Sequence, residues 1–401
     1  MLIVQKFGGT SVGDLDRIQN VANRVKKGVD NGHKIVVVVS AMSGETNKLT
    51  EYAHHFSSNP STREMDMLLS SGERVTASLM AIALNEMGIN SMAMTGRQAG
   101  ISTDGIHTKA RISNIDSKPI LDKVNDGNVI VVAGFQGVTD DGHVSTLGRG
   151  GSDLTAVAIA GAIGADLCEI YTDVDGVYTT DPRIEPHAKK LEKISYDEML
   201  ELASLGAKVL QNRSVEMAKK LNVRVVTRNS FNENEGTLIV NEEEIMEKPI
   251  VSGIALDKNQ ARVTLRDVLD RPGIAADIFG ALSEGNVNVD MIIQNVGTDG
   301  KTNLGFTIPT TELNEAKNSI DKYSHEMKSV DFDENVCKVS IVGVGMKSHS
   351  GVASKAFTAL SNENINILMI GTSEIKISVI VDEKYSELAV RALHSVYELD
   401  K

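Results

Sequence analysis

The sequence predicts an α/β protein: a first domain with a mainly parallel central sheet covered by helices, followed by two smaller α+β domains. Over residues 1–230, short β-branched runs alternate with helical periods, the pattern of a helix-covered parallel sheet. Residues 271–292 then recur as 349–370, with 10 identities in 22 positions at a spacing of 78. A chain of 401 residues also exceeds one ordinary domain.

Composition and charge restrict the class of protein. Acidic residues outnumber basic ones by 54 to 41, giving a formal net charge of −13, and aromatic residues make up only 4% with no Trp. Nucleic-acid binding generally needs a basic surface and stacking rings, so we expect no nucleic acid as a partner. Anionic substrates would need positive charge concentrated in one place against this acidic background.

The cysteines and the apolar runs indicate a cytoplasmic protein. Cys168 and Cys337 are too few for a disulfide framework or a zinc cage, and each lies in an apolar run, so we expect buried, reduced thiols. The first residues lack the pattern of a signal peptide. The longest apolar runs, 35–39 and 129–133, hold about a quarter of the roughly 20 residues that a membrane span needs, so we expect no membrane partner.

The strands of the first domain are expected where β-branched residues form short runs. Several runs are continuously apolar, as strands buried on both faces should be. Between the first two, Ile18, Val21, Ala22 and Val25 recur at helical spacing, which gives a βαβ unit. The strand candidates are 2–7, 34–41, 90–95, 129–135, 166–172 and 223–227.

A long helix is expected over residues 61–88. Ser61 and Glu64 have the spacing of a capping box at its start. An apolar stripe places Glu73 at its edge, facing an interior cleft, whereas Arg74 points to water. The stripe consists of Met65, Leu68, Leu69, Val75, Leu79, Ile82 and Ala83.

An acidic connector at 232–248 separates the first domain from the repeat. Each copy of the repeat reads strand, loop, helix, strand, strand, helix, the order of a small α+β sandwich. Paired copies of this kind create symmetric clefts for small ligands. The expected units are a first domain at 1–240, a connector and strand at 241–260, and two repeat domains at 261–330 and 331–401.

The first glycine-rich element is KFGGTSV at residues 6–12, a strand that runs into a Gly-Gly turn before a helix. Gly8 and Gly9 let backbone N–H groups approach phosphate oxygens closely, and Lys6 adds a mobile charge. Neither a Walker A loop nor a dinucleotide GxGxxG motif is present, and a Gly-Gly turn alone is more often only a tight turn. Phosphate binding therefore stays one of two interpretations of this element.

The second element is GRGGSD at residues 148–153, which leads directly into a helix. Ser152 or Asp153 could serve only as the N-cap of that helix. Arg149 is harder to explain as a cap, because an arginine at a helix N-terminus can bind a carboxylate or phosphate through two parallel hydrogen bonds. The pattern favours a ligand role.

The third element is TDVDGVYTTDPR at residues 172–183, which follows a predicted strand. Its Asp-Gly and Asp-Pro steps are ordinary loop signals. It nevertheless lies at the carboxyl end of a parallel strand, where open α/β sheets place ligand crevices. Lys208, between two helical stretches, is either solvated or reaches into that crevice.

Zinc-hydrolase and catalytic-triad chemistry find no support in the sequence. It has no HExxH or CxxC motif and no convincing His-carboxylate spacing. His33, His54, His55 and His107 lie in polar segments and are interpreted as surface residues. We expect no metal site built from protein ligands.

Six ordered blocks together closely resemble the aspartokinase family of the amino-acid kinase superfamily, and the resemblance covers essentially the whole chain. The repeat, with RPGIAADIF in one copy and HSGVAS in the other, resembles the paired ACT domains of ferredoxin-like fold in that family's regulatory half. The blocks are KFGGTSV at 6–12, SAMSGETNKL at 40–49, REMDMLLSSGER at 63–74, VAGFQGV at 132–138, TLGRGGSDLTA at 146–156 and CEIYTDVDGVYTTDPR at 168–183.

The resemblance implies an ATP- and Mg²⁺-dependent phosphotransferase acting on the side-chain carboxylate of L-aspartate. The product would be 4-phospho-L-aspartate, the first intermediate toward lysine, threonine, methionine and diaminopimelate. A carboxylate is already ionised at pH 7 and needs no general base, so the lack of a catalytic histidine is expected. Alternatives are another enzyme of the same superfamily, or a catalytically inactive amino-acid sensor built on the repeats.

The resemblance also implies roles for individual residues. Lys6, Arg149, Asp181 and Lys208 would be catalytic, and we expect Lys6, Arg149, Arg183 and Lys208 to converge on one cleft. The nucleotide would contact Lys6, Phe7, Gly8, Gly9, Ser40, Thr172, Asp173, Tyr178, Asp181, Arg183 and Lys208. Aspartate would contact Thr46, Glu73, Arg149, Gly150, Gly151, Ser152 and Asp153.

For the repeats, the resemblance implies homo-oligomers and feedback inhibition by lysine, threonine or both. One departure is visible, because Ser350 stands where the family usually shows proline. Paired asparagines after a helix are also common as mere turn formers. The candidate effector contacts are Asp270, Gly273, Ile274, Ala275, Asn288, Asp290 and Gln294 in the first copy, and Ser348, Val352, Asn366, Ile367, Ser373 and Glu374 in the second.

Overall fold

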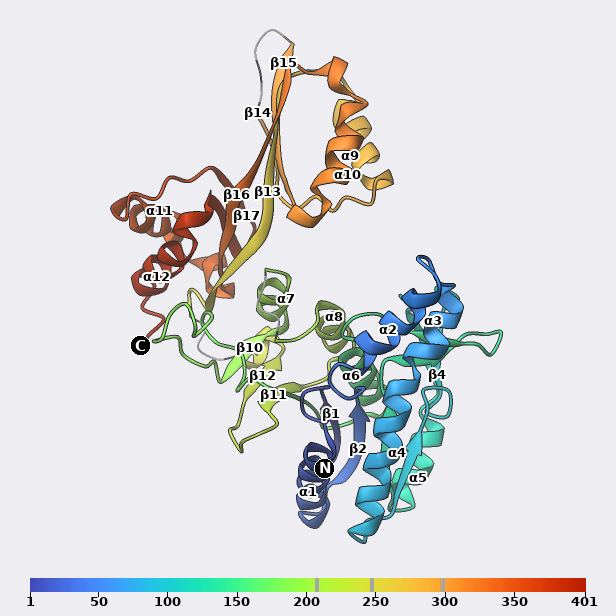
Figure 1. Cartoon of the computed structure of the whole chain (residues 1–401). Coiled ribbons are helices and arrows are strands. Elements are labelled where there is room, and N and C mark those ends of the chain that lie inside the picture. Colours follow the sequence, from blue (N-terminus) through green and yellow to red (C-terminus); the bar gives the residue numbers. More distant parts are fainter. Residues whose placement is uncertain (206–208, 246–248, 296, 298–299) are drawn as a thin grey trace. The chain divides into compact units, whose positions relative to one another are not determined.

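The protein forms two compact units in a computed structural model that describes residues 1–205, 209–245, 249–295, 297 and 300–401 (Figure 1). The first unit comprises Met1–Val177, Lys190–Ser204 and residues 209–245. The second comprises Tyr178–Lys189, Leu205 and the described residues from 249 onward. Each unit is described by itself below.

The first unit contains a central sheet with the strand order β10-β12-β11-β9-β1-β2-β6-β3. Neighbouring strands are parallel except for β11 and β12, which confirms the mainly parallel sheet expected from the sequence. The strands are β1 (Leu2–Phe7), β2 (Lys34–Val39), β3 (Ser91–Met94), β6 (Val129–Ala133), β9 (Leu167–Thr172), β10 (Lys193–Ser195), β11 (Val225–Asn229) and β12 (Thr237–Val240).

Helices cover this sheet on both sides of the central strands. On one side, Ile18, Val21 and Val25 of α1 and Met80 and Leu84 of α4 form a core with the inward residues of β1, β2 and β6. The first expected βαβ unit is thereby confirmed. The helices are α1 (Leu15–Asp30), α2 (Glu45–Phe56), α3 (Thr62–Leu69), α4 (Ser71–Glu86), α5 (Lys118–Asn125), α6 (Gly151–Ile163), α7 (Tyr196–Ser204) and α8 (Asn212–Leu221).

A second, four-stranded sheet with the order β5-β4-β7-β8 was not expected from the sequence. Its strands are only three or four residues long, too short to show a clear alternation. Helix α3 lies against β8 of this sheet. The strands are β4 (Ile101–Thr103), β5 (Ile112–Ile115), β7 (Gln136–Val138) and β8 (Val144–Thr146).

The helix expected over 61–88 is divided at Ser70 into α3 and α4, and the predicted apolar stripe was wrong. Val75 and Ile82 are 52% and 65% exposed. The buried face of α4 consists instead of small and polar residues together with Met80 and Leu84. Ser61 occupies the N-cap position, but its side chain makes no capping hydrogen bond.

Residues Thr62–Glu86 satisfy a length and hydropathy test for a membrane span, with a mean hydropathy of 1.2 in the best window. In the structure, 44% of that window is buried inside the protein. The stretch also carries the buried carboxylates of Asp66 and Glu73. This is the behaviour of a core helix, and the test by itself is weak evidence for a membrane.

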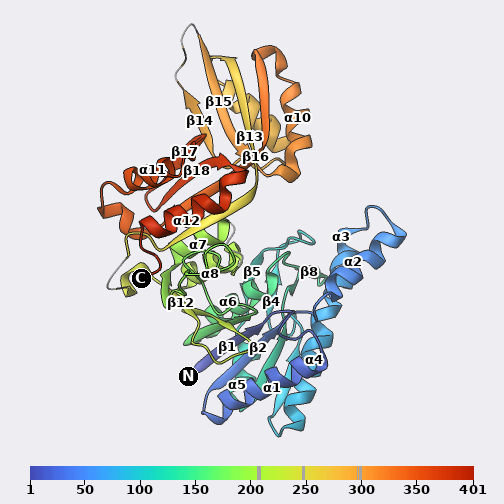
Figure 2. The same cartoon turned by 60° about the vertical axis from the view of Figure 1, so that its left-hand side comes forward.

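The second unit contains one antiparallel sheet with the order β14-β15-β13-β16-β18-β17, built jointly by both copies of the repeat (Figure 2). Helices α9 and α10 pack on the half formed by β13 and β15, and α11 and α12 pack on the half formed by β16 and β18. The elements are β13 (Gly253–Leu269), α9 (Ile274–Glu284), β14 (Ile292–Asn295), β15 (Lys301–Ile308), α10 (Leu313–Asp321), β16 (Ser329–Val342), α11 (Val352–Asn362), β17 (Met369–Thr372), β18 (Lys376–Asp382) and α12 (Ser386–Val396).

The repeat found in the sequence is also a repeat in structure. Helices α9 and α11 begin and end 78 residues apart, the spacing of the sequence repeat. Gly273 and Gly351 precede them with φ angles of 95° and 88°. Only glycine adopts this left-handed conformation without strain, so both copies enter their helix through the same turn.

Candidate active site

The candidate site lies at the carboxyl edge of the central sheet of the first unit. Phe7 at the end of β1 pairs in register with Val39 of β2 and with Tyr171 of β9. The loops that follow these three parallel strands therefore begin side by side. The rings of Phe7 and Tyr171 stack with their centroids 4.7 Å apart, which ties the first and third of these strand ends together.

The Gly-Gly turn is packed closely against its neighbours. The Gly8 N–H donates to Tyr171 O over 3.2 Å, and the Gly8 carbonyl accepts from Ser11 and Val12. A Cβ added at Gly8 would lie 3.3 Å from Lys6 Nζ, and one added at Gly9 would lie 3.0 Å from Ala41 O. Glycines are needed here by close approach, so the turn has a structural role whatever it binds.

Lys6 forms a buried ion pair with Asp153 in the first turn of α6, with Nζ 2.6 Å from Oδ1. The N-cap of α6 is Gly150, with a φ angle of 69°, and no side chain caps the helix. The interpretation of Ser152 or Asp153 as an N-cap was therefore wrong. Asp153 faces the end of β1 instead.

Glu73 is 4% exposed and faces the interior, as the sequence predicts. Its Oε1 accepts the backbone N–H of Ala41 over 3.1 Å, whereas Oε2 has no hydrogen-bond partner within the described residues. Burial raises the pKa of Glu73 to about 7, and the hydrogen bond from Ala41 limits the rise. A buried carboxylate with an open oxygen is suited to receive a cationic group from a ligand.

These contacts connect Glu73 to Lys6. The backbone N–H of Ala41 donates to Glu73. The carbonyl oxygen of Ala41 would lie 3.0 Å from a Cβ added at Gly9, and Lys6 Nζ would lie 3.3 Å from a Cβ added at the adjacent Gly8. The ammonium of Lys6 and the carboxylates of Glu73 and Asp153 therefore lie on adjoining segments, at the ends of β1 and β2 and the starts of α4 and α6.

The remaining residues expected to bind the acceptor lie at the beginnings of helices. Arg149 is exposed, in a turn between Gly148 and Gly150 whose φ angles are 79° and 69°. Ser152 is 7% exposed and lies so close to Gly134 that a Cβ there would come within 3.0 Å of its Oγ. Gly151 is the first residue of α6. Thr46, in the first turn of α2, is half-buried.

The expected nucleotide residues are divided between the units. Ser40 and Thr172 lie at the ends of β2 and β9, and Asp173 is exposed in the loop after β9. Asp175, which sequence reasoning missed, holds this loop by accepting hydrogen bonds from three asparagine side chains, which lower its pKa. These are Asn229, Asn232 and Asn234.

Tyr178, Asp181 and Arg183 belong to the second unit. Asp181 accepts from the Arg183 guanidinium over 2.7–3.2 Å, which lowers the pKa of Asp181. Their segment is attached through Thr179, whose carbonyl accepts from Ile254 N over 2.7 Å. Lys208 lies outside the described residues. The convergence of Lys6, Arg149, Arg183 and Lys208 therefore stays a prediction.

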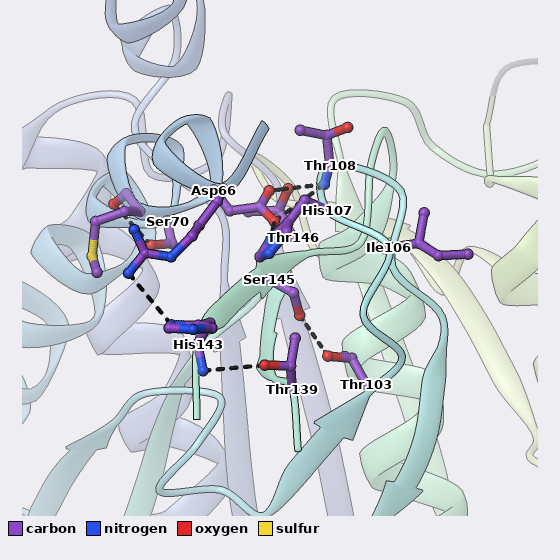
Figure 3. A network of polar contacts seen from close by, with 12 residues as sticks. Asp66, Ser70, Thr103, Ile106, His107, Thr108, Thr139, His143, Ser145 and Thr146 are labelled. Carbon is purple, nitrogen blue, oxygen red and sulfur yellow. Dashed lines mark hydrogen bonds and ion pairs between the residues drawn. The ribbon is translucent and has the colours of Figure 1, made fainter. Parts of the chain in front are cut away.

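One polar network beside the site was not expected. His107, interpreted from sequence as a surface residue, has a side chain only 18% exposed, and its Nδ1 lies 2.6 Å from Oδ2 of the buried Asp66 (Figure 3). Thr108 and Thr146 bind the same carboxylate. Asp66 and His107 are 41 positions apart in the sequence, so no local pattern could have shown the pair.

The candidate effector residues of the first copy surround the start of α9 and the edge strand β14. The buried Lys338 forms an ion pair with Asp290, and Glu312 accepts hydrogen bonds from Asn288. Asp270, Gly273, Ile274 and Ala275 lie before and at the start of α9, and Gln294 lies on β14.

The second copy places its candidates in corresponding positions. Val352 begins α11, and Ser348 ends a short 3₁₀ turn just before it. Asn366 and Ile367 precede β17, and Ser373 and Glu374 follow it. Ser350, the departure from the family pattern, lies in the loop between Ser348 and Val352.

No group of three or more His, Cys, Asp or Glu side chains suited to hold a metal ion occurs in the described part of the chain.

Comparison with known proteins gives matches along the whole chain. Residues 1–229 match the amino acid kinase family, and residues 266–323 and 339–397 each match the ACT domain. The chain is 61% identical over 405 residues to an aspartokinase of Helicobacter pylori, and the match covers 100% of both proteins.

Solved structures agree with the sequence matches. Aspartokinase III of E. coli in complex with aspartate and ADP is 27% identical and superposes with a TM-score of 0.80 over 99% of each chain. The same enzyme in complex with lysine and aspartate is 28% identical, with a TM-score of 0.79 over 98% of this chain and 99% of that one.

Proposed function

Because this chain belongs to the aspartokinase family, we propose that it transfers the γ-phosphoryl group of ATP to the side-chain carboxylate of L-aspartate, giving 4-phospho-L-aspartate. The observation that carries the proposal is the ion pair of Lys6 and Asp153 at the carboxyl edge of the sheet, with the buried Glu73 on an adjoining segment. It combines a buried cation for a phosphoryl group with buried carboxylates for an ammonium group.

The nucleophile in this reaction is a carboxylate, which is ionised at neutral pH without a general base. The difficulty is to bring an anion against the triphosphate, so catalysis depends on alignment and on neutralising charge. Lys6 supplies positive charge at the end of β1. Asp153 holds Lys6 in place. The backbone N–H groups of the Gly8–Gly9 turn would approach phosphate oxygens beside it.

The acceptor amino acid would be held at both ends. The open oxygen of Glu73 accepts the α-ammonium group of aspartate, assisted by Asp153. Arg149, exposed between two glycines, binds a carboxylate through its planar guanidinium. Thr46 and Ser152 are neighbouring donors. The side-chain carboxylate is then free to face the nucleotide.

The nucleotide would lie over the ends of β1, β2 and β9, in contact with Phe7, Ser40, Thr172 and Asp173. Tyr178, Asp181, Arg183 and Lys208 would complete its site by their match to the family motifs. Mg²⁺ bound together with the nucleotide would neutralise part of the charge of the phosphates.

We assign the second unit a regulatory role, with lysine, threonine or both as effectors bound at the two sets of candidate residues. E. coli aspartokinase III, which matches this chain over almost its whole length, has been solved in complex with lysine and aspartate. The first unit would correspond to a kinase domain at 1–240, followed by a connector at 241–260 and ACT domains at 261–330 and 331–401.

The second unit would also form a homo-oligomer. The edge strands β14 and β17 expose Ile292 and Ile370 by 52% and 41%. Exposed apolar edge strands favour pairing with another copy of the chain.

We place the enzyme in the cytoplasm, at the first step toward lysine, threonine, methionine and diaminopimelate.

A direct test is to trap the acyl phosphate with hydroxylamine and measure the hydroxamate formed from ATP and L-aspartate. We expect product with L-aspartate and none when ATP is omitted. A signal with glutamate or a nucleoside monophosphate but not with aspartate would indicate another enzyme of the superfamily. Binding of lysine or threonine without any turnover would indicate an inactive amino-acid sensor.

A further inference from the structure

Asp66 is a fully buried carboxylate that joins three segments of the first unit. Its Oδ2 accepts from His107 Nδ1 over 2.6 Å, and both oxygens accept the Thr108 N–H over 3.0 and 3.1 Å. Its Oδ1 also accepts from Thr146 Oγ1, as Figure 3 shows. The donors come from the loop after β4 and from β8, so this one side chain on α3 fixes both segments to the helix.

The backbone held by Asp66 is strained. Thr108 has a φ angle of 66°, in the left-handed region that β-branched residues rarely adopt. Such a conformation persists only where its surroundings hold it, and it occurs often at functional sites. Here the hydrogen bonds from Thr108 N–H to the Asp66 carboxylate hold it.

The strained loop lies directly against the segment that presents Arg149. Ala110 N donates to Thr146 O over 2.9 Å. A Cβ added at Gly148 would lie 3.3 Å from Thr108 O. Arg213 donates to the carbonyls of both Ala110 and Leu147. The position from which Arg149 emerges is thus defined by the loop that Asp66 anchors.

The same network reaches the helix that carries Glu73. Gln136, 2% exposed, donates from Nε2 to the carbonyl of Ser70 over 2.9 Å, at the junction of α3 and α4. Gln136 also pairs in register with Thr146. The junction just before Glu73 and the strand just before Arg149 are therefore joined twice, by Asp66 with Thr146 and by Gln136 with Ser70.

We propose that Asp66 is a positioning residue for the amino-acid substrate, which sets the spacing between Glu73 and Arg149. The inference rests on the proposed function, in which these two side chains bind the α-ammonium group and a carboxylate of one small molecule. Binding a short, rigidly spaced pair of charges requires its partners to be held at a fixed separation. Asp66 contacts His107, Thr108 and Thr146, none of which is a proposed nucleotide residue, so we expect nucleotide binding to change little when Asp66 is replaced.

The test is the substitution Asp66→Asn, assayed by hydroxamate formation with ATP and L-aspartate varied independently. The asparagine side chain has nearly the same volume as aspartate, but one of the two carboxylate oxygens is replaced by an NH₂ group. This donor would face the donors of His107, Thr108 and Thr146. We expect KM for aspartate to rise at least tenfold, while KM for ATP and kcat change less than threefold. Ser145→Ala is the matched control, because it removes a buried hydrogen bond to Thr103 in the same sheet, next to Thr146.

Two variants of His107 provide a second measurement that does not alter the buried carboxylate. His107→Leu removes the donor to Asp66 and should raise KM for aspartate. His107→Asn provides an amide N–H near the position of Nδ1 and should restore KM to within about threefold of the wild-type value, which a merely structural loss would not explain. If Asp66→Asn does not fold, this pair decides the question.

The outcomes distinguish the positioning role of Asp66 from the proposed aspartate site on which it rests. Arg149→Ala serves as the reference for a lost aspartate contact. If Arg149→Ala raises KM for aspartate but Asp66→Asn and His107→Leu only lower the melting temperature, as Ser145→Ala does, Asp66 is structural and the inference is wrong. If Arg149→Ala leaves KM for aspartate unchanged, the assignment of Arg149 fails and the positioning role fails with it.

Discussion

Lys6 and Asp153 form an ion pair of 2.6 Å in which the two side chains are only 9% and 13% exposed. A buried pair contributes little net stability, but removal of one partner leaves an uncompensated charge. The pair therefore holds the side chain of Lys6 in place at the end of β1 before any ligand binds. This explains why a lysine can remain buried at a site that must later face phosphate.

The first prediction concerns the charge of Lys6. Because that charge opposes the charge that develops during phosphoryl transfer, Lys6→Ala should lower kcat by a factor on the order of 10²–10³ and change KM for ATP far less. Lys208→Ala should likewise lower kcat strongly and change KM for ATP far less. Lys26→Ala removes an exposed ion pair with Asp30 and is the control. A loss confined to KM for ATP would show that Lys6 only binds the nucleotide.

The second prediction is a pH dependence of aspartate binding. Burial raises the pKa of Glu73 to about 7, so a large part of Glu73 is protonated below neutral pH in the free enzyme. The neutral form cannot pair with an ammonium group, so KM for aspartate should rise about tenfold between pH 8 and pH 6. In Glu73→Gln, KM should be high at both pH values. An unchanged pH profile in this variant would remove Glu73 from the explanation.

The third prediction is a stability cost at the same residue. The folded-state pKa of Glu73 is raised from 4.5 to about 7, so the folded state binds the proton more tightly and the free energy of unfolding decreases as pH rises through this range. At pH 8 the cost is about 3 kcal/mol. Glu73→Gln without ligand should therefore melt at a higher temperature than the wild type at pH 8, with a smaller difference at pH 5. Glu86→Gln, at the exposed end of α4, should melt like the wild type at both pH values.

The parallel strands were the part of the fold that the sequence predicted best. The bounds of β1 match the prediction, and those of β2, β3, β6, β9 and β11 lie within about two residues of it. Strands buried on both faces appear as continuous apolar runs, which no other short element matches well. The strands of the small second sheet were missed, because three or four residues are too few to show a period.

The helix at 61–88 shows where periodicity misled. Its largest apolar residues defined a stripe, but α4 packs through Gly72, Thr76 and Ala77 and leaves Val75 exposed. Close packing selected small residues: a Cβ on Gly72 would lie 2.7 Å from the Cβ of Ala41. In the first two turns of α4, size rather than hydrophobicity determined which residues are buried, and a hydrophobic count cannot show this.

The candidate site was predicted in part for a related reason. Lys6, Glu73 and Asp153 lie in motifs that a sequence displays locally, and in the structure Lys6 pairs with Asp153 while Glu73 accepts from Ala41 at the end of β2. The pair of Asp66 and His107, by contrast, joins residues far apart in the chain. Such pairs depend on tertiary structure alone, so a single sequence does not reveal them.

The fourth prediction concerns the two thiols. Cys168 and Cys337 are both buried and free, as the sequence predicts, and burial raises the pKa of Cys337 to about 12 and that of Cys168 further. Thiols that stay protonated are poor nucleophiles. Neither should react with iodoacetamide at pH 8 within an hour in the folded protein, and both should react in guanidinium chloride. Rapid modification of the folded protein, measured by mass spectrometry, would contradict this burial.

The last prediction concerns regulation. Lys338 is 4% exposed and forms its ion pair with Asp290, a candidate effector residue that is itself 41% exposed on its side chain. If Asp290 binds the ammonium group of an effector, Asp290→Asn should weaken inhibition by lysine or threonine at least tenfold while leaving activity without effector within threefold. Activity measured over a grid of lysine and threonine concentrations checks this and shows which effector acts. Asp321→Asn, at the end of α10, provides a control in the same copy of the repeat. Inhibition that is unchanged in Asp290→Asn would place the effector elsewhere, because an ammonium group bound at this position would lose its counter-charge.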